Sequence, residues 1–173
     1  MDAPRSCGAC TVCCTALAIE TAELRKQPGV TCRHCTATGC GIYETRFPIC
    51  RSYFCGWINL PELDESWRPD VSGILISPHR EGIPPHYELR EGIEFLVLGG
   101  EAAVRRPEFA ALIAKLLRGR TPAFIAVPGP KGHYPARVFL NDALARMAPP
   151  ALPNAFAAIL GAAKGHRFEP MSP

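Results

Sequence analysis

The chain has 173 residues, of which 47% are hydrophobic and 20% charged, and its formal net charge is +3 at pH 7. This length allows one ordinary domain or a small module beside a second one, and the composition is that of a soluble globular protein, which excludes a disordered or fibrous chain. The charge is too small to indicate nucleic-acid binding, and no run of about 18 apolar residues and no export signal are seen, so we expect a cytoplasmic protein with no membrane contact.

All nine cysteines lie between residues 7 and 55, and residues 56–173 contain none. Cysteines scattered through a hydrophobic core would not cluster in this way. A disulfide framework favours an even number of cysteines in an exported chain, whereas this number is odd. Metal ligation by thiolates explains the pattern best, because short C-x-x-C spacings bring two ligands to one point. The candidate ligands are Cys7, Cys10, Cys13, Cys14, Cys32, Cys35, Cys40, Cys50 and Cys55.

The spacing of the cysteines leaves the metal open between zinc and an iron–sulfur cluster. Cys7, Cys10 and Cys13 follow one another at steps of three, with Cys14 directly after, and a similar spacing plus one remote cysteine holds a cubane cluster. The segment Cys32-Arg-His-Cys35 instead has the spacing of a zinc knuckle. Nine thiolates could form two four-sulfur sites with one left over, a zinc cluster with bridging sulfurs, or an iron–sulfur cluster beside a zinc ion.

Three further side chains are candidates for a supporting role at such a site. Guanidinium groups can stabilise an anionic thiolate–metal centre by donating hydrogen bonds to sulfur, and we expect Arg46 and Arg51 to do so. His34 could act as a nitrogen ligand, although an imidazole that is solvated or that only supports the ligands is the simpler interpretation.

The order Cys7-x-x-Cys10-x-x-Cys13-Cys14, Cys35, Cys40-x-Ile42-Tyr43-x-x-Arg46-x-Pro48-x-Cys50-Arg51 and Cys55 resembles the YkgJ-type cysteine-cluster proteins, described as zinc- or iron-chelating domains. The resemblance covers about residues 7–56 and implies ligand positions at eight of the cysteines, while Cys32 is less clearly matched. Family members usually carry proline directly after the arginine, where this chain has Phe47, so the turn around Arg46 can differ. Because relatives include redox-like proteins and a flagellin lysine methylase, the resemblance implies a site and not a reaction.

Only small elements are predicted within the cysteine-rich module, which we place at residues 1–58. Leu17 and Ile19 alternate as in a short strand, and residues 21–26 predict a short helix that Thr21 caps and Pro28-Gly29 ends. Such elements cannot bury a core of their own, so we expect bound metal to organise the module, at about 10 kcal/mol per structural zinc site. Residues 57–70 have the composition of a connection.

Residues 59–173 predict a small α+β domain with short strands and two to three helices. Apolar runs bounded by Gly or Pro predict strands at 71–77, 95–98, 124–127 and 137–140. An apolar stripe with proline at its first position predicts a helix over 107–118, a second helix is expected over 154–164, and Asn141 is expected to cap a shorter one ending near Met147. The fold class is therefore α+β, with an irregular metal-organised N-terminal module.

No catalytic motif is found in this second part. Gly99-Gly100 lacks the pattern of a phosphate-binding loop, so a plain turn is expected. His79, Glu81 and His86 could bind a second metal, but solvent-exposed loop histidines are the simpler interpretation. Residues 128–135 predict a hairpin connection, with an anion or partner contact as the alternative.

We therefore expect a metal-binding protein that holds zinc or an iron–sulfur centre through its cysteines, in a structural, chelating or metal-handling role. The alternative is an iron–sulfur redox enzyme or electron carrier, which the vicinal Cys13-Cys14 pair and the surplus sulfur favour. A nucleic-acid module is a third interpretation, supported only by the arginines of the first 56 residues. Metal ions are the only partners that the sequence indicates.

Overall fold

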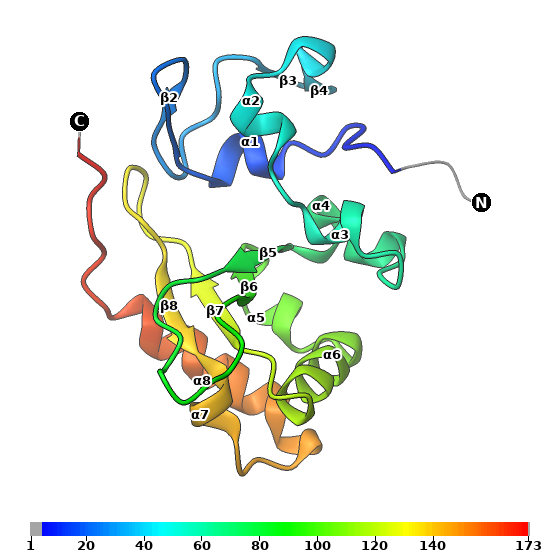
Figure 1. The fold of residues 1–173 in the computed structure, drawn as a ribbon, viewed down its shortest axis with the longest axis vertical. Helices are drawn as coiled ribbons and strands as arrows, with labels where there is room; N and C mark the ends of the chain where they lie inside the picture. Colours follow the sequence, from blue (N-terminus) through cyan, green and yellow to red (C-terminus); the bar gives the residue numbers. More distant parts are fainter. Residues whose placement is uncertain (1–4, 173) are drawn as a thin grey trace.

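The computed structural model describes residues 5–172, in which a cysteine-rich part lies above a four-stranded sheet and its helices (Figure 1). The cysteine-rich part contains only short elements, which are joined by turns and irregular chain. They are α1 (Val12–Ala16), β1 (Ile19–Glu20), β2 (Arg25–Lys26), β3 (Cys35–Thr36), β4 (Gly39–Cys40), a 3-10 turn (Tyr43–Thr45) and α2 (Pro48–Arg51). Two antiparallel ribbons result, β1 with β2 and β3 with β4. The predicted α+β class with a cysteine-rich N-terminal region is confirmed.

The short helix predicted over residues 21–26 is wrong, because this stretch closes the β1–β2 ribbon. The main-chain N–H of Leu24 donates to Thr21 Oγ1 at 3.0 Å, and the N–H of Thr21 donates to the carbonyl oxygen of Leu24 at 3.0 Å. The threonine side chain therefore stabilises a tight turn and not a helix N-terminus. As a consequence Lys26 lies on a strand, where it is buried.

The second part consists of a mixed sheet and the helices that follow its strands. Its elements are α3 (Gly56–Asn59), a 3-10 turn (Glu65–Trp67), α4 (Pro69–Ser72), β5 (Ile74–His79), β6 (Gly92–Val97), α5 (Gly100–Val104), α6 (Pro107–Arg118), β7 (Ala123–Val127), β8 (Ala136–Phe139), α7 (Leu140–Leu144), a 3-10 turn (Pro149–Ala151) and α8 (Leu152–Lys164). The strand order is β5-β6-β7-β8, and only β6 and β7 run parallel. The longest of the described helices, α8, has 13 residues, and none could cross a membrane.

The four strands and two long helices expected from the sequence are present, and all but α6 have shifted ends. The first strand begins at Ile74 and not at Val71, since α4 continues to Ser72 and ends at Gly73 in the left-handed region, φ 68°. Asn141 does not cap a helix, because it lies buried inside α7. Its Oδ1 accepts from the N–H of Ala123 at 2.8 Å and its Nδ2 donates to the carbonyl oxygen of Thr121 at 2.9 Å, which ties α7 to the start of β7.

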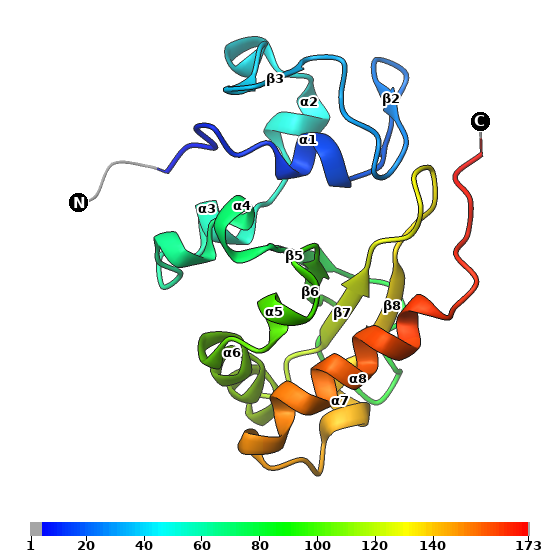
Figure 2. The same cartoon turned by 180° about the vertical axis from the view of Figure 1, so that it is seen from behind.

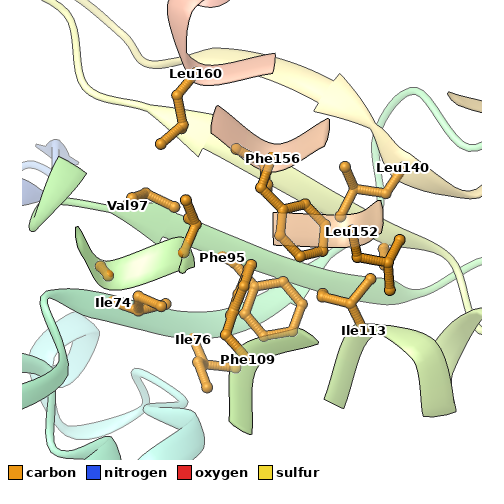
Figure 3. Close-up of a cluster of buried hydrophobic side chains, with 14 of the residues drawn as sticks. Ile74, Ile76, Phe95, Val97, Phe109, Ile113, Leu140, Leu152, Phe156 and Leu160 are labelled. Carbon is orange, nitrogen blue, oxygen red and sulfur yellow. The ribbon is translucent and has the colours of Figure 1, made fainter. Parts of the chain in front are cut away.

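The main hydrophobic core lies between the sheet and α5, α6 and α8 (Figure 3). The ring of Phe109 packs edge-to-face against Phe95 at 5.4 Å and against Phe156 at 5.0 Å between ring centroids, the arrangement that aromatic pairs favour. The stretch 57–70 is more than a connection, because Trp57, Leu63 and Trp67 are buried in this same core.

The other face of the sheet carries the cysteine-rich part. Leu75, Leu96 and Ala126 are buried there, and Val12, Ala16, Leu17 and Tyr53 pack against them. In both views of the ribbon the cysteine-rich part lies on one side of the sheet, and α6, α7 and α8 lie on the other (Figures 1 and 2). A single apolar contact surface therefore positions the cysteine segments relative to the rigid sheet.

Candidate metal centre

A cavity of about 470 Å³ lies within the cysteine-rich part, and eight of the nine cysteines line it. They are Cys7, Cys10, Cys13, Cys14, Cys32, Cys40, Cys50 and Cys55. All nine cysteines fall within the described residues, and each is a free thiol. Cys35 is the one that does not line the cavity, and its Sγ lies 3.7 Å from the carbonyl oxygen of Thr36.

The first four cysteines are arranged by a turn and by helix α1. The N–H of Cys10 donates to the carbonyl oxygen of Cys7 at 2.9 Å, and α1 begins two residues later at Val12. Cys13 and Cys14 are consecutive residues of this helix, so their side chains leave it in directions about 100° apart.

The next three cysteines lie on a loop and a ribbon that are bonded to α1. The N–H of Cys32 donates to the carbonyl oxygen of Cys14 at 2.9 Å. The N–H of Cys35 donates to the carbonyl oxygen of Cys32 at 3.0 Å. Cys35 and Cys40 are then directly opposite each other in the β3–β4 ribbon.

Two glycines bring the ribbon close to the first turn. Gly39 has φ 130°, and a Cβ there would lie 2.7 Å from the carbonyl oxygen of Gly8, whose own φ is 53°. A side chain at position 39 would therefore push the two cysteine-bearing loops apart.

The last two cysteines come from α2 and from the residue before α3. Pro48 occupies the first turn of α2, as proline favours, and the extended Phe47 precedes it, which places Cys50 within the helix. Cys55 directly precedes α3. The Arg5 guanidinium donates to the carbonyl oxygens of Trp57 at 2.6 Å and Leu60 at 3.3 Å, which holds the chain before Cys7 against the helix that follows Cys55.

Cys13 and Cys14 differ strongly in acidity. A hydrogen bond between the two side chains raises the pKa of Cys13 far above its ordinary value and lowers the pKa of Cys14 to about 6. Lys26 and Arg46 favour the Cys14 thiolate further through their positive charge. At neutral pH the metal-free pair is therefore one thiolate that accepts a hydrogen bond from one thiol.

Most of the other thiols are harder to ionise than a free cysteine. Burial is the main cause that raises the pKa of Cys10, Cys35, Cys50 and Cys55, and neighbouring thiols raise it further. A bound metal ion has the opposite effect and lowers the pKa of these thiols, because it stabilises the thiolates that coordinate it.

Lys26 is a candidate site residue that the sequence did not indicate. It is only 5% exposed, and its Nζ donates to the carbonyl oxygens of Val30 at 2.8 Å, Gln27 at 3.3 Å and Thr15 at 3.4 Å. Burial lowers the pKa of Lys26, whereas the thiols of Cys32, Cys14, Cys13 and Cys35 oppose this when they are ionised. A buried ammonium group beside several thiols suits an anionic thiolate–metal centre.

The three residues expected to support the site all line the cavity. The Arg46 guanidinium lies over the Tyr43 ring at 3.7 Å, and its Nε donates to the Tyr43 carbonyl oxygen at 2.8 Å. His34 accepts a hydrogen bond from Arg33 Nε at 3.1 Å and lies against Phe47. Arg51 is exposed at the border of the same cavity.

The donor chemistry of the cavity fits zinc or an iron–sulfur cluster. Sulfur is the ligand that both groups take from proteins, and nothing else in the cavity lining offers donors in comparable number. Among residues 5–172, no three His, Cys, Asp or Glu side chains stand in a coordinating arrangement. Tyr53 also lines this cavity, and its hydroxyl is buried without a hydrogen-bond partner among the same residues. The fit therefore rests on the kind and number of the donors.

The histidines of the second part do not form a joint cluster with Glu81. His79 lies on β5 with its Nδ1 3.6 Å from the buried Glu94, which also pairs with Arg137. His86 instead lies 3.9 Å from Asp142 and is exposed. The expectation of solvent-exposed loop histidines is wrong for His79, whose side chain is 12% exposed. The stretch 128–135 connects β7 and β8 as expected.

The chain matches no family model, no curated protein and no solved structure.

Proposed function

We propose that the protein binds metal through its clustered cysteines, holding zinc or an iron–sulfur centre in a structural, chelating or metal-handling role in the cytoplasm. The observation that carries this proposal is that eight cysteines, from segments spread over residues 7–55, line one cavity. Random placement of buried thiols would not direct them to a common space.

The energetics of the cysteine-rich part support the same proposal. Its strands have two residues each and its helices four or five, and five of its side chains pack against the buried patch of the sheet. Elements of this size are marginal without further stabilisation. A structural metal site contributes about 10 kcal/mol to folding and could supply that stabilisation.

The resemblance to YkgJ-type cysteine-cluster proteins supports metal binding as well. Most of the residues that carry it, including Tyr43, Arg46 and Cys50, line the cavity, whereas Cys35 and Pro48 do not. Membership of that family is part of this proposal.

The second candidate is an iron–sulfur redox protein or electron carrier. The Cys13–Cys14 pair favours it, because a thiolate with a pKa of about 6 beside a second thiol is suited to react or exchange electrons near a cluster. The two candidates differ in colour, since an iron–sulfur cluster absorbs visible light and zinc does not.

The test is anaerobic purification followed by elemental analysis, an absorption spectrum and a free-thiol count on the same sample. We expect at least one zinc ion or iron–sulfur cluster per chain and fewer accessible thiols than nine. The Ser52→Ala variant serves as a control that is expected to bind as much metal as the wild-type chain. Ser52 lies exposed between Cys50 and Cys55, and its hydroxyl donates to the nearby carbonyl oxygen of Ile49. Less than one metal per chain in both proteins would contradict the proposal.

A further inference from the structure

We propose that residues 168–172, which come after α8, form a strap that fixes the loop around Lys26 and thereby raises the affinity of the cysteine-rich part for metal. This inference rests on the proposed function, that the cysteines bind metal at all. It assigns a role in metal binding to a segment that contains no cysteine and lies more than 110 residues beyond the last one.

The strap pairs with the connection between β7 and β8, residues 128–135. The N–H of Tyr134 donates to the carbonyl oxygen of Glu169, and the N–H of Met171 donates to the carbonyl oxygen of Gly132, each at 2.8 Å. An antiparallel bridge lies between these two bonds. In both ribbon views the strap runs beside the β7–β8 connection (Figures 1 and 2). The strap is therefore held in place like a short additional strand.

Two side chains of the strap add packing to these bonds. The side chain of Met171 is buried, since the residue is only 3% exposed. The ring of Phe168 lies so close to Gly129 that a Cβ built on this glycine would be 2.8 Å from Cδ1 of the ring. Removing the strap therefore takes both main-chain bonds and buried apolar surface from the β7–β8 connection.

The β7–β8 connection in turn contacts the loop 27–30 of the cysteine-rich part. The N–H of Gly132 donates to the carbonyl oxygen of Pro28 at 2.8 Å. A Cβ built on Gly29 would lie 3.5 Å from the Cα of Lys131, so the two backbones are in close contact. Gly132 takes part in both pairings, because its N–H bonds to the loop and its carbonyl oxygen bonds to the strap.

The loop 27–30 supplies most of the acceptors of the Lys26 ammonium group. Two of the three carbonyl oxygens that accept from its Nζ belong to this loop, and the third belongs to Thr15 in α1. The N–H of Gly29 donates to the carbonyl oxygen of Ala16 at 3.2 Å, which joins the loop to α1 as well. A displaced loop would leave the ammonium group with one acceptor.

The Lys26 side chain joins two segments that carry cysteines. Its acceptor Thr15 directly follows Cys14, and its acceptor Val30 lies two residues before Cys32. The same two segments are bonded to each other, since the N–H of Cys32 donates to the carbonyl oxygen of Cys14 at 2.9 Å. A thiolate–metal centre is anionic, so a positive charge held between these segments stabilises the bound state.

A continuous series of main-chain bonds therefore leads from the strap through the β7–β8 connection and the loop 27–30 to α1. Detaching the strap is expected to loosen the loop and to lower the affinity for metal. Because coupling between two binding events is reciprocal, metal must in turn stabilise the pairing of the strap by the same factor.

The first test compares the wild-type chain with a chain that ends at Arg167, both reconstituted with Zn²⁺ without oxygen. Competition with a chromophoric chelator is expected to show an affinity at least about fivefold lower for the shortened chain, as is usual for coupled sites. Met171→Ala should lower the affinity in the same way, and Met147→Ala is the matched control because Met147 is 46% exposed. Equal affinities of the wild-type and shortened chains would overturn the inference.

Hydrogen exchange of the zinc-saturated chains, followed by NMR, tests the route through the loop. Shortening the chain is expected to speed the exchange of the Gly29 N–H, while the amides of α6 keep their protection. A lower affinity with unchanged exchange at Gly29 would contradict this route.

The reciprocal effect can be measured in the wild-type chain alone. Loading with Zn²⁺ is expected to slow the exchange of the Met171 N–H, which bonds to Gly132. Equal exchange of this amide with and without Zn²⁺ would overturn the inference even if the shortened chain failed to fold.

The two proposals fail in different ways. A wild-type chain that binds no metal contradicts the proposed function, and the role of the strap with it. A wild-type chain that binds Zn²⁺ no more tightly than the shortened chain contradicts only the role of the strap.

Discussion

The ammonium group of Lys26 donates a hydrogen bond of 2.8 Å to the carbonyl oxygen of Val30 and so closes the loop between the β1–β2 ribbon and Cys32. A lysine that is buried on a strand and bonded to main-chain carbonyls brings a positive charge into the protein. This charge stabilises the ionised form of the neighbouring cysteine thiols.

Replacing Lys26 with methionine is expected to weaken metal binding by about tenfold or more, since a charge-assisted interaction contributes about 1.5–3 kcal/mol. Competition with a chromophoric chelator measures the change. Arg25→Met is the control, because Arg25 is the neighbouring residue with a side chain that is 51% exposed. Equal affinities of the two variants would contradict a role for the buried ammonium group.

The acidity of Cys14 predicts a pH dependence in the reduced, metal-free protein. Because its pKa is lowered to about 6, the thiolate is present above that pH and is lost as the pH falls through it. Alkylation of Cys14 should therefore level off above about pH 7, whereas alkylation of Cys50, whose pKa is raised by burial, should still accelerate with pH where that of Cys14 is already constant. Mass spectrometry of samples quenched across the pH range gives both rates.

The Cys13→Ala variant tests the cause of that acidity. Without the thiol that donates to it, the pKa of Cys14 should return toward its ordinary value, and its alkylation at pH 7 should slow. An unchanged rate would show that the Cys13 hydrogen bond is not the source of the low pKa.

Removing metal with a chelator is expected to unfold the cysteine-rich part and leave the sheet intact. None of the buried residues of the core around Phe95, Phe109 and Phe156 is a metal ligand candidate, and of the cysteines only Cys55 packs against it, whereas the cysteine-rich part has little core of its own. Hydrogen exchange should therefore show lost protection within residues 5–55 and retained protection in β5 to β8 and α8. Uniform loss over the whole chain would contradict this prediction.

Gly39→Ala is expected to lower metal content because it separates two cysteine-bearing loops. The new Cβ would lie 2.7 Å from the carbonyl oxygen of Gly8, and φ at this position is 130°. A strained backbone of this kind costs on the order of 1–3 kcal/mol. Gly161→Ala is the control, since a Cβ meets nothing within 4 Å there and alanine favours the helix. Elemental analysis of both variants compares their metal content, and equal values would contradict the close packing of the loops.

Local sequence patterns were sufficient to predict the elements that neighbouring residues define. Helix α6 begins and ends at the predicted residues, because Pro107 and an apolar stripe define it from within. The helix expected over 21–26 failed, since Thr21 can either cap a helix or close a turn and only the pairing of β1 with β2 decides between them. Asn141 failed for a related reason, because its amide bonds to residues about 20 positions away.

The sequence likewise predicted only part of the candidate site. The density of cysteines predicted that their sulfurs share one region, and eight of them line a common cavity. The sequence could not distinguish Cys35 from the rest, because Cys35 pairs with Cys40 across the β3–β4 ribbon and only Cys40 lines the cavity, a difference that the spacing of the cysteines does not contain. Lys26 was missed because a buried lysine is rare, and nothing in the neighbouring residues signals it.

The patch formed by Leu75, Leu96 and Ala126 has a consequence for the turnover of the protein in a cell. Val12, Ala16, Leu17 and Tyr53 shield this patch from water, and they belong to the part of the chain that we expect to depend on metal for its folding. A chain starved of metal would expose an apolar β-surface, which promotes self-association and attracts chaperones and proteases. The abundance of the protein would then follow the metal supply, since turnover would remove the chains that had not been loaded.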